Sequence, residues 1–146
     1  LELGALPIVN ENDSVCFDEI ETEHKVFGDN DTLSAVVAAL LKADLLVLLS
    51  DIDGVFDRDP HRDPDARLIP VIDGLTDELW ALAGGAGSSF GTGGMQTKFQ
   101  AAEIANAAGV DMVITNGAKP DNLYFLADGG RIGTLFRAAR RKDDAK

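Results

Sequence analysis

Cysteine, histidine and basic residues are all scarce in this 146-residue sequence. The single cysteine, Cys16, excludes an intrachain disulfide and a metal site of several thiolates, and it suits a reducing cytoplasm. The two histidines, His24 and His61, lack the spacing of metal ligands. We therefore expect a cytoplasmic protein with no metal site built from its own side chains.

Positive charge is scarce as well: 13 Lys and Arg residues stand against 25 Asp and Glu residues, a formal net charge of -12. Nucleic acid and anionic membranes both demand basic patches, so the composition argues against either partner. Long apolar runs are missing too, because Lys42 and Asp44 interrupt the stretch 35–49, and no signal peptide is evident. A small anionic ligand stays open, since it needs only a few local donors.

What is present fits one soluble globular domain, because 146 residues with 45% hydrophobic and 26% charged content can bury a core. The opening Leu-Glu-Leu-Gly is typical of the end of a helix, so we expect that an N-terminal part of the domain is missing. We place the domain at residues 1–137 and a charged tail at residues 138–146.

Apolar runs typical of strands alternate with helical periodicity along the chain. The run 44–50 (DLLVLLS) has no polar alternation, which indicates a central parallel strand covered on both faces. After a cap at Asp29 or Asn30, apolar residues recur at helical spacing through Leu41. Further strands are expected at 5–9, 68–72, 110–115 and 133–136, with a hairpin within 14–27, and further helices at 76–82, 94–108 and 121–126. This order predicts an α/β domain on a mostly parallel sheet.

A glycine-rich stretch, GGAGSSFGTGGMQTK at 84–98, leads into the helix expected at 94–108. Free N–H groups at a helix N-terminus favour anions, and Lys98 adds a full charge there, so the stretch can bind phosphate. It matches neither common phosphate signature, because Thr97 stands where a Walker A motif has glycine, and Gln96 where a dinucleotide fingerprint has it. A mobile surface loop is the alternative.

Polar residues also follow the expected strands, at 10–13, 50–53 and 116–119, where ligands of such sheets collect. The group Asp51-Ile52-Asp53-Gly54 is similar to the first motif of haloacid-dehalogenase-type phosphatases. Their partner acidic pair would follow a later strand, whereas the expected strand at 110–115 is followed by Asn-Gly-Ala-Lys. An ordinary Asp-Gly turn after a core strand is the simpler interpretation.

Taken in order, six stretches resemble the amino acid kinase family, and within it the branch that phosphorylates glutamate. They are PIVNENDSV (7–15), GDNDTLSA (28–35), LLVLLSDIDGVFDRDP (45–60), GTGGMQTK (91–98), NGAKP (116–120) and GTLF (133–136). The stretch SDIDG alone is shared with sister kinases for aspartate, N-acetylglutamate and UMP, which remain alternatives. The resemblance implies a three-layer αβα sandwich and transfer of the ATP γ-phosphoryl to the glutamate side chain, the first step of proline biosynthesis.

The resemblance also implies roles for particular residues. Lys98 would be catalytic and Asp31 would orient it, while glutamate would be held by Asp13 and Asn30, with Asn10 nearby. The nucleotide would be bound by Ser50, Asp51, Thr92, Gly93, Gly94, Met95, Gln96, Thr97 and Lys98. Mg²⁺ would accompany ATP and neutralise its phosphates.

The family pattern includes a first half, with its own glycine-rich loop and a second catalytic lysine, that these 146 residues do not contain. We therefore expect the chain by itself to be inactive. A homo-oligomer and feedback inhibition by proline are further implications of the resemblance. A module that kept the fold without catalysis is a third hypothesis beside the kinase and the phosphatase.

Overall fold

The structure is a computed structural model that describes residues 4, 6–10, 30–84 and 94–139. The hairpin expected within 14–27, the glycine-rich residues 85–93 and most of the tail lie outside the described residues. Among those described, the elements in chain order are α1 (Asn30–Leu41), β1 (Leu45–Ser50), β2 (Val71–Ile72), α2 (Asp77–Gly84), α3 (Gly94–Ala107), β3 (Asp111–Asn116), α4 (Asn122–Ala127) and β4 (Thr134–Phe136).

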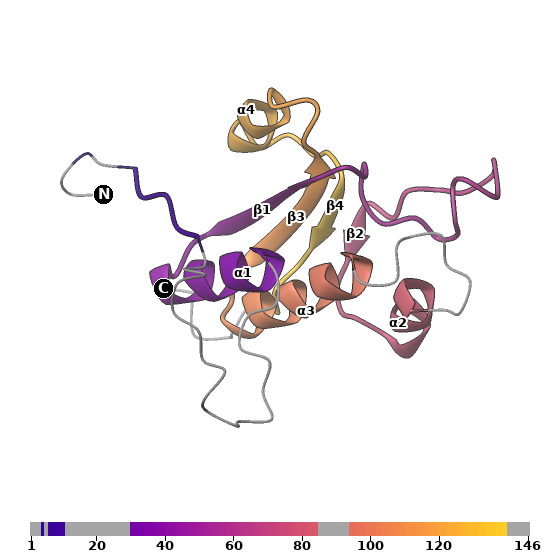
Figure 1. Cartoon of the computed structure of the whole chain (residues 1–146), viewed down its shortest axis with the longest axis horizontal. Helices are drawn as coiled ribbons and strands as arrows, with labels where there is room; N and C mark the ends of the chain where they lie inside the picture. The colour runs from indigo at the N-terminus through magenta and orange to yellow at the C-terminus, as the bar shows by residue number, and fades with distance from the viewer. Residues whose placement is uncertain (1–3, 5, 11–29, 85–93, 140–146) are drawn as a thin grey trace.

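These strands form one mixed sheet in the order β1-β3-β4-β2 (Figure 1). β1 pairs with β3 in parallel over six residues, and β2 pairs with β4 in parallel. The antiparallel pairing of β3 with β4 joins the two parallel pairs. The sheet is therefore mostly parallel, as the sequence predicts.

Helices lie on both sides of this sheet. α1 and α3 pack side by side against one face, and α2 packs against α3. α4 lies on the other side, following the end of β3 (Figure 1). There Asn122 donates a hydrogen bond from Nδ2 to Thr115 Oγ1 at 3.1 Å. The α/β class with helices flanking the sheet is confirmed.

Small side chains let α1 and α3 approach each other closely. Ala35 and Ala38 of α1 are buried, as are Ala101, Ala102 and Ala105 of α3. Larger rings fill the space between α2, α3 and the sheet. Trp80 meets Phe99 edge to face at a centroid distance of 5.5 Å, and Phe99 meets Phe136 in the same way at 5.8 Å.

Short connections fix the direction of each helix relative to its strand. Only residues 42–44 separate α1 from β1, and only residues 108–110 separate α3 from β3. Gly109 makes the second turn with φ +84°, a left-handed conformation that favours glycine, as expected at this helix end. Each helix therefore begins at the carboxyl end of the strand that follows it, and this end of the sheet receives the N-termini of α1 and α3.

The segment after β1 returns to the sheet as a braced loop. Phe56 forms an isolated antiparallel bridge with Leu68, and Ile69 N donates to Val55 O at 2.8 Å. Buried Thr134 ties the base of the loop to β4: its Oγ1 accepts from Val55 N at 2.8 Å and donates to Ile69 O at 2.7 Å. Gly54 permits this approach, because a Cβ there would lie 2.6 Å from Thr134 Oγ1.

Two expectations about strands are wrong. Residues 6–10 form no strand, and Leu6 and Ile8 are 84% and 93% exposed, because no described strand lies beside them to complete their hydrogen bonds. The run 44–50 does form β1, but β1 is an edge strand of the described sheet. Its Leu45 and Leu49 are exposed while Leu48 is buried, so β1 is not covered on both sides.

Candidate functional site

An ion pair between the N-terminal parts of α1 and α3 is the centre of the candidate site. Lys98 Nζ lies 3.1 Å from Asp31 Oδ2, and the two residues are 67 positions apart in sequence. The Lys98 side chain is 14% exposed and that of Asp31 is 23% exposed. Both charges are therefore partly buried and directed toward each other at the carboxyl end of the sheet.

Neighbouring groups of α3 complete this arrangement, which we call the helix-terminus cluster and define as Asp31, Gly94, Thr97 and Lys98. Thr97 Oγ1 lies 3.0 Å from Asp31 Oδ2 and 3.0 Å from Gly94 O. Lys98 Nζ also donates to Gly94 O, at 3.3 Å. The lysine is thereby held by one carboxylate and one carbonyl, rather than extended into solvent.

The location of the cluster favours negative ligands. The first N–H groups of α1 and α3 have no intrahelical acceptor, and each helix carries a partial positive charge at this end. Lys98 adds a full charge beside them, and Asp31 offsets part of it. An anion such as a phosphate group would find N–H donors and a cation together at this end of the two helices.

A second group of polar residues lies where β1 and β3 end. Ser50 Oγ donates to Asp51 Oδ1 at 3.0 Å, and Gly117 N donates to Ser50 O at 2.7 Å. Asn116 Nδ2 donates to Asp53 Oδ1 at 2.9 Å, while Asn116 Oδ1 accepts from Ala118 N at 2.9 Å. The loops after the two parallel strands are therefore bound to each other.

Asp53 and Asn116 are not among the residues to which the family resemblance assigns a role. A signal existed, because both belong to polar stretches that directly follow expected strands. What the sequence could not show is that the two side chains, 63 positions apart, bond to each other.

The remaining predicted site residues are distributed as follows. Asn30 is exposed as the first residue of α1, directly before Asp31. Asn10 is exposed outside any helix or strand. Gln96 reaches toward the end of α2, since a Cβ on Gly84 would lie 2.5 Å from its Nε2. Asp13, Thr92 and Gly93 lie outside the described residues.

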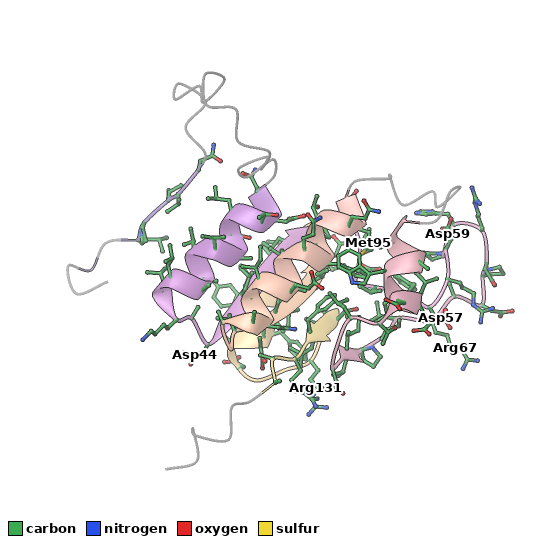
Figure 2. All side chains as sticks on the ribbon, turned by 90° about the horizontal axis from the view of Figure 1, so that it is seen from below. Asp44, Asp57, Asp59, Arg67, Met95 and Arg131 are labelled. Carbon is green, nitrogen blue, oxygen red and sulfur yellow. The ribbon has the colours of Figure 1, made fainter. Side chains whose placement is uncertain are left out.

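The Met95 side chain points into the core, unlike the side chains of Thr97 and Lys98, which face Asp31. The side chain of Met95 is buried between α3 and α2, as Figure 2 shows, and belongs to the core. A nucleotide contact at this position would therefore come from the main chain.

Within the part of the chain that the structure describes, no group of three or more His, Cys, Asp or Glu side chains could hold a metal ion. No helix there is long and apolar enough to cross a membrane.

The chain combines a mostly parallel sheet, helix N-termini at the carboxyl ends of its strands, and a lysine held there by an aspartate. These features agree with the class of protein to which the sequence comparison assigns the chain. The chain belongs to the amino acid kinase family, whose sequence model matches residues 1–116. This membership excludes the haloacid-dehalogenase-type phosphatase considered from the Asp51 to Gly54 stretch.

More particularly, the chain is similar to glutamate 5-kinases. It is 51% identical to the glutamate 5-kinase of Deinococcus radiodurans over 146 residues, which is 100% of this chain and 39% of that protein. It is 50% identical to the glutamate 5-kinase of Listeria monocytogenes over 142 residues, 97% of this chain and 51% of that protein. The chain thus spans between 39% and 51% of the length of these two relatives.

Among solved structures, the fold is similar to isopentenyl phosphate kinase of T. acidophilum. The TM-score is 0.53 at 30% sequence identity, and the match covers 73% of this chain and 38% of that one. The three-layer amino acid kinase architecture expected from the sequence is therefore supported by the structural comparison as well.

Proposed function

We propose that the protein carrying this chain transfers the γ-phosphoryl group of ATP to the side-chain carboxylate of L-glutamate. The product would be L-glutamyl 5-phosphate, formed in the first step of proline biosynthesis. The observation that carries the proposal is the Lys98–Asp31 pair, 3.1 Å apart where the N-termini of α1 and α3 adjoin. The choice of glutamate rests on the names of relatives to which this chain is about half identical over the 39–51% of their length that it spans.

Phosphoryl transfer requires positioning and positive charge more than covalent chemistry from the protein. Lys98 would place its ammonium group against the oxygens of the transferring phosphoryl, where charge builds up in the transition state. Asp31 would keep the flexible lysine side chain in one direction before the nucleotide arrives. The N–H groups of the first turn of α3 would hold the phosphates.

The nucleotide would extend from the helix-terminus cluster to the loop after β1. Residues 92–98 would contact the phosphates, and Ser50 and Asp51 would contact the rest of the nucleotide. Magnesium would enter with ATP as part of the substrate complex. Mg²⁺ bound to substrate phosphates needs only one or two protein carboxylates and keeps several waters, so it does not require a cage of acidic residues.

Glutamate would bind beside Asn30, with Asp13 and Asn10 completing its site. Asn30 is exposed and adjoins Asp31 in sequence, so its amide is available next to the catalytic pair. Amide and carboxylate groups are suitable partners for the ammonium and carboxylate of an amino acid. A homo-oligomer in the cytoplasm and inhibition by proline also belong to this proposal, and they rest on the family resemblance.

The test is an acceptor comparison with the complete protein that carries this chain. Hydroxylamine traps acyl phosphates, so hydroxamate formation from MgATP is measured with glutamate, aspartate and N-acetylglutamate, and ADP release is measured with UMP. We expect turnover with glutamate to exceed that with each other acceptor by about a hundredfold or more, because an unpaired polar group in a specific site costs several kcal/mol. Preference for another acceptor would assign the chain to a sister kinase.

A non-catalytic module is distinguished by binding. Isothermal titration of the complete protein with MgATP and with glutamate should give binding of both for a kinase. Absence of binding for both, together with absence of turnover, would contradict the proposal.

A further inference from the structure

Thr97 occupies an unusual place in the helix-terminus cluster. A threonine in a helix commonly bonds its hydroxyl to the carbonyl three or four residues earlier, and Thr97 Oγ1 is indeed 3.0 Å from Gly94 O. The same oxygen is also 3.0 Å from Asp31 Oδ2 in α1. The hydroxyl thus lies between a local acceptor of its own helix and a carboxylate from a distant part of the sequence.

The hydroxyl and the lysine share the same two acceptors. Lys98 Nζ is 3.1 Å from Asp31 Oδ2 and 3.3 Å from Gly94 O. A threonine hydroxyl has a single proton and can donate to only one acceptor at a time, whereas an ammonium group has three. Rotation about one bond moves the hydroxyl proton between the two acceptors, and no heavy atom has to shift.

We propose that Thr97 is a positioning residue, which acts through Asp31 on the direction and release of Lys98. The inference rests on the proposed function, because it requires that Lys98 act on the transferring phosphoryl. When Lys98 turns toward the phosphate, Thr97 donates its proton to Asp31 Oδ2. The carboxylate keeps a donor, and the ammonium can leave it at lower cost.

The partial burial of the pair explains why the replacement donor matters. Asp31 is 23% exposed and Lys98 14% exposed, so water reaches the carboxylate only in part. A partly buried carboxylate that loses its cation without gaining another donor is destabilised, which would hold Lys98 in the resting pair. This role uses the Thr97 hydroxyl on Asp31, so it adds to the nucleotide contact expected from the family resemblance.

The test compares Thr97→Val with Thr97→Ser in the complete protein. Valine keeps the shape and removes the hydroxyl, and serine restores the hydroxyl without the methyl group. We expect Thr97→Val to lower kcat about tenfold with KM values for MgATP and glutamate within about twofold, the pattern of a group that acts in the transition state. Thr97→Ser should keep at least about half of the parent kcat.

Ser34 supplies a matched control, because its Oγ donates to the main-chain Asp31 O at 2.7 Å and not to the carboxylate. Ser34→Ala removes a hydroxyl beside the same residue and should leave kcat within about twofold of the parent. Thermal unfolding of every variant shows that it is folded at the assay temperature. If Thr97→Val does not fold, Thr97→Ala repeats the measurement without added bulk.

A double-mutant cycle separates a role through Asp31 from a structural role. In an Asp31→Asn background, Thr97→Val should change kcat by less than about twofold, because the group it acts through is already altered. An undiminished tenfold loss in that background, a serine variant as impaired as the valine variant, or a valine variant with parental kcat would each overturn the inference. Lys98→Ala tests the proposed function independently: full activity there would refute the role of Lys98 itself.

Discussion

Two sets of charged residues in this molecule contrast in nearly every physical respect. The helix-terminus cluster joins α1 to α3 across 67 positions of sequence, and its charges are partly buried. The loop between β1 and β2 has its own network, in which Arg58 lies 3.4 Å from Asp57 and 3.0 Å from Asp63. These partners are at most five positions apart, and Arg58 is 52% exposed.

The charged residues of the loop between β1 and β2 stabilise the conformation of that loop itself. Asp59 Oδ1 accepts from His61 N and Asp63 Oδ1 from Asp65 N, each at 2.9 Å, so the carboxylates close turns of their own segment. Figure 2 shows the labelled Asp57, Asp59 and Arg67 at one end of the molecule, far from α1. Exposed pairs of this kind contribute little to stability. The partly buried pair, which requires α1 to pack against α3, is the one that we propose to act on a ligand.

The largest expected effect is the difference in activity between residues 1–146 by themselves and the complete protein. If the helix-terminus cluster were sufficient, residues 1–146 would form glutamyl phosphate from MgATP and glutamate. We expect hydroxamate formation at least about a thousandfold below that of the complete protein, because the family pattern clamps the phosphoryl from two sides and positioning is worth several kcal/mol. Addition of the first half of the family pattern as a separate polypeptide should restore activity. Robust turnover by the purified chain would show that one side suffices.

The loop should depend on its buried anchor more than on its exposed charges. Thr134→Val removes the hydroxyl that accepts from Val55 N and donates to Ile69 O, and leaves the first group without that partner in a buried place and the second in a partly buried one. We expect a loss of about 1–3 kcal/mol in the free energy of unfolding, measured by urea denaturation. Thr134→Ser is the matched control and should recover most of the loss. Equal stability of the valine variant and the parent would be inconsistent with this anchor.

The smallest effect is expected for Asp63→Asn. The hydrogen bond from Arg58 lowers the pKa of the Asp63 carboxyl, with a further contribution from the Asp65 N–H. A carboxyl whose pKa is lowered by folding stabilises the native state above its unfolded pKa of about 4, and this stabilisation is lost as pH falls through the lower native value. Since the group is exposed, we expect nearly equal melting temperatures for variant and parent at pH 7, and any difference should vanish at strongly acidic pH.

Most of the helices and strands could be predicted, because their signals are local. The glycine stretch before an alanine-rich run and Gly109 after it placed α3 within one residue of its observed end. The strand expected at 110–115 is observed as β3, displaced by one residue. By contrast, a run such as 44–50 is apolar whether it is central or at an edge, so local pattern could not place β1 at the edge of the described sheet.

Members of the candidate site could be proposed from the sequence, but most of the contacts between them could not. Lys98 and Asp31 could be named from the family resemblance, and their pairing at 3.1 Å agrees with the orienting role implied for Asp31. The sharing of Asp31 Oδ2 and Gly94 O by Thr97 and Lys98 could not be predicted, because it depends on how α1 packs against α3. The same holds for the Asp53–Asn116 hydrogen bond between two loops.

The most direct measurement is kcat for hydroxamate formation in Lys98→Ala, set beside Arg58→Ala, in the complete protein. Removal of one preorganised charge that acts on the transition state should lower kcat about 10²–10³-fold, or roughly 3–4 kcal/mol, with a smaller change in the glutamate KM. Arg58→Ala, which breaks only exposed pairs, should keep kcat within about twofold of the parent. A Lys98→Ala enzyme that turns over within a few-fold of the parent would contradict the claim that the helix-terminus cluster is the catalytic site.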